Sequence, residues 1–250
     1  MKNSEELRQQ LRSINRKSYP AYKGLKGLYH FGNYILSIDH VQGDPFASPS
    51  HVSIQISHRD AGFPVEYYKD TLTGTTLCDY LTRQFEKQVS QYSFRAKGSG
   101  KSGLISISHC GQEVLERTAC EITKEGIHIR FFVGFPANGR TINSGELEKI
   151  LFVYLPKCVE MSLYHRKVLE RETEQVICLK EDQRVIREEL KKRGLIAFVA
   201  NGSILPRQSG NSDLPMKDAV PFQSPKSMEI TIQLRCMMLL FLKLKFVWQN

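Results

Sequence analysis

The run from Lys97 to Gly103 holds residue types that can bind phosphate. It reads Lys97-Gly98-Ser99-Gly100-Lys101-Ser102-Gly103. Glycine lets backbone N–H groups approach an anion closely, and lysine supplies the opposite charge. A Walker A loop also needs a glycine five residues before Gly100 and a helix after the serine. Position 95 is Arg95, and the alternation after Gly103 predicts a strand. We therefore expect a flexible basic loop and reject Walker A; the loop either binds phosphate or is a solvated hairpin loop.

A second group of reactive side chains lies between residues 39 and 46. Asp39, His40, Gln42 and Asp44 bring two carboxylates, an imidazole and an amide into one short loop. They offer an acid–base pair or part of a metal shell. The structural interpretation of the same residues is a loop held by Asx turns. The histidines and cysteines show no spacing typical of metal ligands, so we assign no metal site and no catalytic residue.

The charge balance indicates either an anionic partner or simple solubility. The chain of 250 residues carries 35 Lys and Arg against 26 Asp and Glu, a net charge of +9. Such a surplus is typical of proteins that contact the phosphates of nucleic acid, nucleotide or lipid. Six scattered cysteines without a CxxC pair predict reduced thiols and a cytoplasmic location. No run of 18 apolar residues precedes residue 236, so we expect no membrane partner.

Hydrophobic periodicity and turn residues predict the elements that hold these loops. Helices are expected at 4–16, 76–92, 144–174 and 181–193, with a break before Pro156 and a C-terminal cap at Gly194. Two capping boxes are expected, Asn3 with Glu6 and Thr76 with Asp79. The strands are expected at 28–41 (or a hairpin there), 51–57, 104–108, 126–134, 195–200 and 228–234, the short helix or turn at 112–119, and the loops at 42–49 and 201–225.

Seven blocks, in order, resemble one family, the predicted ATPases of the ABC class. The blocks are Tyr19 to Lys23, Ile38 to Ser50, Lys97 to Gly103, Gly111 to Thr118, Phe135 to Arg140, Glu181 to Gln183 and Phe198 to Met216. The resemblance covers residues 4–234 and is specific, because the blocks share both order and approximate spacing. The residues placed in family motifs are Asp39, His40, Gln42, Asp44, Gln112, Glu113, Arg117, Asn201, Ser203 and Arg207.

The resemblance also implies what is missing. The phosphate loop of the family follows the strand that corresponds to residues 228–234, whereas this chain changes character at about Arg235. We expect a truncated member that lacks Walker A, Walker B and the ABC signature, through a frameshift or premature stop. A genuine short paralogue and a functionless pseudogene product are the alternatives. The segment 236–248 is apolar at nearly every position, so it needs a partner surface or risks aggregation.

The resemblance implies a fold of α+β / α/β class. Residues 1–165 are expected to form a mixed α+β domain, 166–234 the incomplete start of a P-loop ABC-type core, and 235–250 an aberrant tail. The full-length family is expected to bind ATP and Mg²⁺, hydrolyse ATP and form a homodimer; this chain is expected to hold no cofactor. A standalone module for RNA or single-stranded DNA is the alternative. Nucleotide phosphate is assigned to Lys97–Ser102, and nucleic acid to Lys23, Lys26, Arg95, Lys97, Lys101 and Arg140.

Overall fold

The computed structural model describes residues 1–93, 96–165, 167–212, 214–228, 230, 232, 234 and 244–245. The chain divides into two compact units. The first holds residues 1–110 and 114–170, and the second holds 111–113 and 171–250. The domain boundary at 165/166 stays a prediction. Among the described residues, no helix is long and apolar enough to cross a membrane.

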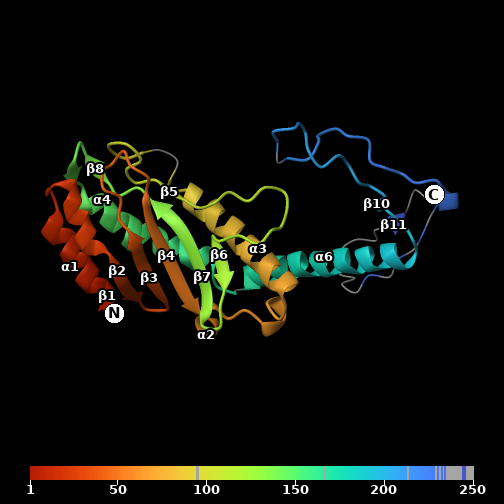
Figure 1. Ribbon diagram of the computed structural model, residues 1–250, viewed down its shortest axis with the longest axis horizontal. Coiled ribbons are helices and arrows are strands. Elements are labelled where there is room, and N and C mark those ends of the chain that lie inside the picture. The colour runs from red at the N-terminus through yellow and green to blue at the C-terminus, as the bar shows by residue number, and fades with distance from the viewer. Residues whose placement is uncertain are drawn as a thin grey trace. The chain divides into compact units, whose positions relative to one another are not determined.

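The first unit is built on one twisted sheet (Figure 1). Its strands are β1 (Lys2–Asn3), β2 (Gly27–Phe31), β3 (Tyr34–His40), β4 (Ser50–Ser57), β5 (Ile105–Ser106), β6 (Cys120–Ile122) and β7 (Gly126–Val133). The strand order is β1-β2-β3-β4-β7-β5, and β6 also pairs with β7. All these pairs are antiparallel except β1 with β2. Two small ribbons are also described: β8 (Ala137–Asn138) pairs with β9 (Thr141–Ile142) in the first unit, and β10 (Val199–Ala200) pairs with β11 (Leu244–Lys245) in the second.

One face of the sheet is buried and the other is open. Along β4, Val52, Ile54 and Ile56 are buried, whereas the side chain of Gln55 is only half buried. This alternation follows from the two-residue period of a strand. Phe85 of α3 (Thr71–Ser90) meets Phe131 of β7, with ring centroids 5.1 Å apart. The helices therefore cover the apolar face, and a mixed α+β fold is confirmed.

The helices of the first unit begin where side chains satisfy free N–H groups. In α1 (Ser4–Ile14) the predicted capping box is confirmed, because the Asn3 carboxamide oxygen accepts from Glu6 N at 2.7 Å. The start predicted for α3 is wrong. Asp70 caps this helix by accepting from Thr73 N at 2.9 Å, which adds a turn before Thr76. The remaining short helical elements are α2 (His58–Ala61) and the 3₁₀ turns η1 (Tyr19–Leu25) and η2 (Val65–Tyr67).

The helix break predicted before Pro156 is also wrong. The chain continues from α4 (Ser144–Lys149) through the π turn η3 (Ile150–Tyr154) into α5 (Leu155–Ser162). Pro156 lies in the first turn of α5, where a missing N–H group is tolerated. A π turn shifts the hydrogen-bond register of the backbone. As a result, no carbonyl of the preceding turn lies where the proline ring would clash with it. The break falls instead after Ser162.

The second unit is centred on the long helix α6 (Lys167–Lys192), which begins in the first unit. The segment predicted as a separate helix at 181–193 is the end of α6, and Gly194 closes it with φ +64°, as predicted. A small core surrounds Ile232 and takes in Ile186, Leu190 and Phe198. The strand predicted at 195–200 is reduced to β10, and that at 104–108 to β5. Residues 226–228 form the 3₁₀ turn η4. Of the strand predicted at 228–234, residues 229, 231 and 233 lie outside the described residues, as does most of the apolar tail.

Candidate functional site, a junction of four sequence blocks

Four of the blocks singled out in the sequence meet at one end of the sheet, where β4 begins and β7 ends. They are η1, the loop 42–49, the loop 97–103 and the segment 135–140, and together we call them the loop junction. The Tyr19 hydroxyl donates to Phe135 O at 3.0 Å, and the Tyr22 hydroxyl donates to Pro136 O at 2.7 Å. These contacts join positions more than 110 residues apart in the sequence. The junction lies near the label β8 in Figure 1.

Gln42 holds the centre of the junction. Its side chain is buried, and its carboxamide oxygen accepts from Ser50 N at 3.2 Å and from Phe135 N at 3.1 Å. Its amide nitrogen donates to Asp44 O at 3.1 Å. One neutral amide therefore satisfies two buried N–H groups that belong to different segments.

The Gly-Lys-Ser run is packed into the junction by its own backbone. Ser99 N donates to Ala137 O at 2.9 Å, and Lys101 N to Pro45 O at 3.4 Å. Lys97 N and Ser102 N donate within the run, and Gly103 N donates to Gly134 O. The Ser102 side chain is buried, and its hydroxyl donates to Ser99 O.

Five N–H groups of this run are therefore already used inside the protein. A triphosphate cradle needs such groups pointing free toward the anion, and a helix behind them. The run is instead followed by β5, as the sequence predicts. In this conformation, its backbone does not fit a nucleotide triphosphate. The assignment of phosphate to Lys97–Ser102 stays a prediction, and these contacts weigh against it.

Two glycines permit the close packing of the run. A Cβ atom on Gly100, where φ is +59°, would lie 2.2 Å from Pro45 O. A Cβ atom on Gly134 would lie 1.9 Å from Lys101 O. Both positions exclude any larger residue, so the glycines serve loop packing here.

The basic residues of the junction differ in how much of their charge is free. Lys97 pairs with Glu146 at 3.0 Å, and its ammonium lies 4.7 Å from the centre of the Tyr154 ring. Burial opposes its charge, but the hydrogen bond and charge of Glu146 raise the pKa of Lys97 above its ordinary value. Arg140 pairs with Asp44 at 2.9 Å while its side chain stays 80% exposed. Asp44 also makes the predicted Asx turn, because its Oδ1 accepts from Phe46 N at 3.0 Å.

Three of the predicted cations are exposed and form no ion pair with any described residue. They are Lys23, Lys26 and Lys101. Sequence reasoning missed two more, Arg16 and Lys17. Their backbones bond to Ile142, which places them beside the β8–β9 ribbon. No motif marks them, and only the tertiary contact brings them to the junction. Arg95 lies outside the described residues.

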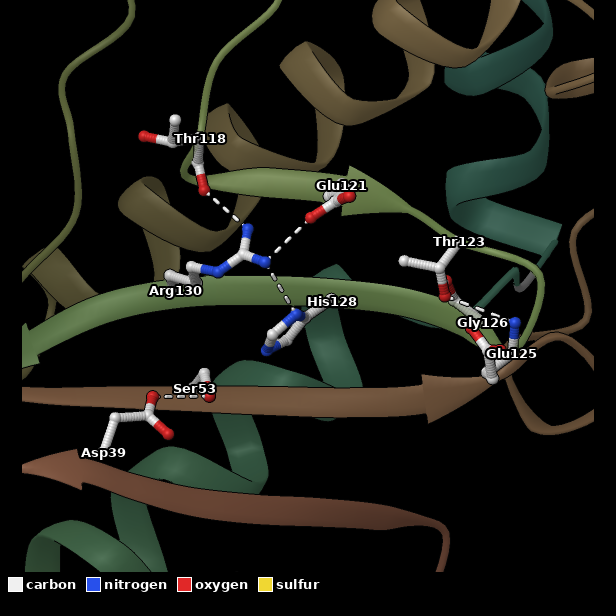
Figure 2. Close-up of polar contacts among 9 residues, drawn as sticks. All are labelled: Asp39, Ser53, Thr118, Glu121, Thr123, Glu125, Gly126, His128 and Arg130. Carbon is white, nitrogen blue, oxygen red and sulfur yellow. Dashed lines mark hydrogen bonds and ion pairs between the residues drawn. The ribbon is translucent and has the colours of Figure 1, made fainter.

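Asp39 and His40 end strand β3, and their side-chain contacts are with neighbours on β4. Asp39 accepts from Ser53 Oγ at 2.8 Å, as Figure 2 shows. The His40 ring lies 5.5 Å from the His51 ring. Both residues are exposed, and their contacts are those of a strand surface.

On the open face of the sheet, Arg130 organises a small polar network (Figure 2). Its guanidinium donates to Thr118 O at 2.9 Å, pairs with Glu121 at 2.7 Å and donates to His128 Nδ1 at 3.0 Å. Burial and then the charge of Arg130 lower the pKa of His128, which favours the neutral ring, the form that can accept this hydrogen bond. The sequence gives no motif for this network.

The other motif residues lie in two separate parts of the chain, one in each unit. In the first unit, Arg117 lies 3.5 Å from the buried carboxylate of Asp79, which also pairs with Arg83 at 2.6 Å. In the second unit, Arg207 donates to the Gln112 side chain at 3.2 Å, and Gln112 donates to Pro206 O.

The long loop after β10 uses the remaining motif residues. Asn201 Oδ1 accepts from Ser224 N at 3.0 Å, and Ser203 O accepts from Phe222 N at 2.9 Å. Glu113 is exposed. Among the described residues, no three His, Cys, Asp or Glu side chains are grouped so as to hold a metal ion.

The fold and the junction define a mixed α+β domain that is followed by the start of a second unit. Two family models match this arrangement. The first, described as ATPase of the ABC class N-terminal, matches residues 4–166, and the second, described as P-loop domain, matches residues 169–238. The chain therefore belongs to the ATPases of the ABC class, as the sequence blocks predict. The second match supports an α/β nucleotide-binding core after the first domain, in agreement with the predicted fold class. No curated protein matches the chain.

Proposed function

We propose that this chain supplies the N-terminal domain and the beginning of the P-loop core of an ATPase, and that it does not itself hydrolyse ATP. In full-length relatives, ATP and Mg²⁺ are held by a Gly-Lys-Ser/Thr loop, whose lysine reaches the phosphates and whose hydroxyl binds Mg²⁺. Two such cores are proposed to dimerise around ATP. The 250 residues contain no complete motif of this kind.

The observation that carries this proposal is the packing of the one Gly-Lys-Ser run. Its serine hydroxyl and five of its N–H groups bond within the protein, so phosphoryl transfer lacks the cradle that positions and neutralises the reacting phosphates. Free thiols at Cys78, Cys110, Cys120, Cys158 and Cys178 suit a reducing compartment, and we propose a cytoplasmic location.

The test is release of inorganic phosphate from ATP by the purified chain in the presence of Mg²⁺. We expect no activity above buffer, and a Lys101→Ala variant indistinguishable from the parent. Turnover that persists through purification and is lost in Lys101→Ala would place a working phosphate loop at residues 97–102 and refute the proposal.

A second function, binding of RNA or single-stranded DNA, is favoured by the exposed cations of the loop junction. Lys23, Lys26 and Lys101 are exposed and have no carboxylate partner among the described residues. Cations on loops attract the phosphate backbone without reading its sequence. We propose that Lys23 and Lys101 of the junction, together with Lys26 directly after η1, contact phosphate, and that Arg140 of the junction contributes as well.

This function is tested by titrating a labelled RNA at two salt concentrations. Each phosphate contact adds about 0.7 to the slope of log affinity against log salt for a single strand. A triple Lys23, Lys26 and Lys101→Gln variant should therefore lower that slope by about 2. The matched control changes three exposed lysines outside the junction, Lys69, Lys124 and Lys157, to Gln. Equal loss in the two variants, or no RNA binding at low salt, would reject the junction as the interface.

A further inference from the structure

A cleft of about 500 Å³ lies in the first unit, away from the loop junction. The turn between β2 and β3 forms one wall, with Gly32 and Asn33. The helix α2 and the end of α5 form the others. Neither the ATPase motifs nor the basic residues described above contribute to it.

Two buried polar atoms at this cleft have no hydrogen-bond partner among the residues that the structure describes. The Tyr34 side chain lines the cleft and is 93% buried, since its exposed fraction is 7%, and its hydroxyl is unpartnered. His165 lines the same cleft, and its Nε2 is buried and unpartnered. Buried polar groups are almost always hydrogen-bonded, so two exceptions at one cleft require an explanation.

The other buried tyrosines show what Tyr34 lacks. The Tyr19, Tyr22 and Tyr29 hydroxyls each donate to a backbone carbonyl, at 3.0, 2.7 and 2.8 Å. Burial is the main cause that raises the pKa of Tyr34 above its ordinary value, and the neighbouring Tyr164 raises it further. Its hydroxyl therefore keeps its proton at neutral pH, and Tyr164 is another residue that lines the cleft.

The lining of the cleft combines aromatic rings with negative charge. Phe31 stacks on Tyr34 with centroids 5.3 Å apart and planes 16° from parallel. Asp60 and Glu160 also line the cleft, whereas none of its described lining residues is a lysine or arginine. A smaller hollow that shares Tyr34 and Asp60 adds Glu125, and the described part of the chain places no lysine or arginine in its lining. In a protein of net charge +9, this local sign is the reverse of the average.

We propose that this cleft binds a small organic cation that carries N–H donors, such as an alkyl ammonium group. The Tyr34 oxygen and the His165 Nε2 accept its hydrogen bonds, the carboxylates attract its charge, and the ring faces stabilise it by cation–π contact. Phosphate is disfavoured because the carboxylates repel it. Both acceptor atoms are buried, so the rings that line the cleft must shift slightly to admit the ligand.

The test titrates the whole chain with putrescine, tetramethylammonium and inorganic phosphate, followed by calorimetry and by the side-chain NMR signals of tyrosine and histidine. We expect putrescine to bind and to shift the signals of Tyr34 and His165, tetramethylammonium to bind more weakly because it has no N–H group, and phosphate not to bind.

Tyr34→Phe removes only the unpartnered hydroxyl. It should weaken putrescine binding at least five-fold while leaving the melting temperature of the free protein unchanged or higher. Asp60→Asn should weaken binding through the lost charge. The matched control, Tyr29→Phe, loses a made hydrogen bond and should lower the melting temperature without changing affinity. Failure of putrescine to bind, tighter binding of phosphate, or undiminished affinity in Tyr34→Phe would each overturn the proposal.

Discussion

Replacement of Gln42 by methionine tests whether one buried amide holds the loop junction together. Methionine has nearly the same length and volume but neither donates nor accepts a strong hydrogen bond. Ser50 N and Phe135 N would each lose the oxygen that they reach at 3.2 and 3.1 Å. An unmade hydrogen bond at a buried group costs about 1–3 kcal/mol, so the expected loss is roughly 2–5 kcal/mol.

The loss is measured by urea unfolding followed by circular dichroism. In a unit of this size, each kcal/mol lowers the melting temperature by about 2–4 °C, so a fall of roughly 4–20 °C is expected as well. The control is Gln55→Met on the open face, where the side chain is half buried and no contact of the junction is touched; its effect should stay within about 0.5 kcal/mol. A Gln42→Met variant that is as stable as this control would refute the reasoning.

Three further predictions concern stability. Tyr22→Phe should cost about 0.5–1.5 kcal/mol, because Pro136 O loses one of its two donors, the Tyr22 hydroxyl at 2.7 Å, and keeps Asn143 N; calorimetry would contradict this with an unchanged melting temperature. Burial raises the pKa values of Tyr22 and Tyr34 above the ordinary 10.0. Below pH 10 both states keep these protons and stability is unaffected, whereas above pH 10 only the unfolded chain releases them, so each tyrosine lowers stability by about 1.4 kcal/mol per pH unit. The check is to measure the free energy of unfolding against pH above 10 for the parent and for the double variant Tyr22→Phe, Tyr34→Phe. Equal slopes of stability against pH in the two proteins would exclude this explanation. Asn3→Ala should cost about 1 kcal/mol through the lost cap of α1, which urea unfolding measures, and a cost no larger than that of an exposed Gln→Ala change inside α1 would contradict it.

Local features of this fold could be predicted from the sequence, because local residues determine them. The cap at Asn3, the αL position of Gly194 and the strand at 51–57 each depend on neighbours within a few residues. The start of α3 could not be predicted as well, because two residues that can cap a helix, Asp70 and Thr76, lie only six positions apart.

The candidate site depends on contacts that no local pattern encodes. Each block is recognisable in the sequence by itself, but no block shows which other block it contacts. The hydrogen bond between Tyr22 and Pro136 joins segments 114 residues apart. The neutralisation of Lys97 by Glu146, 49 residues away, is equally invisible in the run around Lys97. The residue types therefore predict which segments contribute to the candidate site. Whether each charge there is free or paired is visible only in the three-dimensional structure.

The π turn that carries the chain past Pro156 also explains a spacing in the sequence. Five apolar side chains recur at every fourth position and are all at most 1% exposed: Leu147, Leu151, Leu155, Val159 and Leu163. In a regular α-helix each step of four residues advances by about 400°, so four steps would carry the last side chain roughly 160° around the axis from the first. The π turn η3 holds more residues per turn, so each residue in it rotates the chain less around the helix axis. This reduces the total rotation and keeps the five side chains on one side. Deleting one residue from 152–154 would shorten one step of the row to three residues, so a regular α-helix would then hold all five side chains within about 80° of one another and the π turn would no longer be needed.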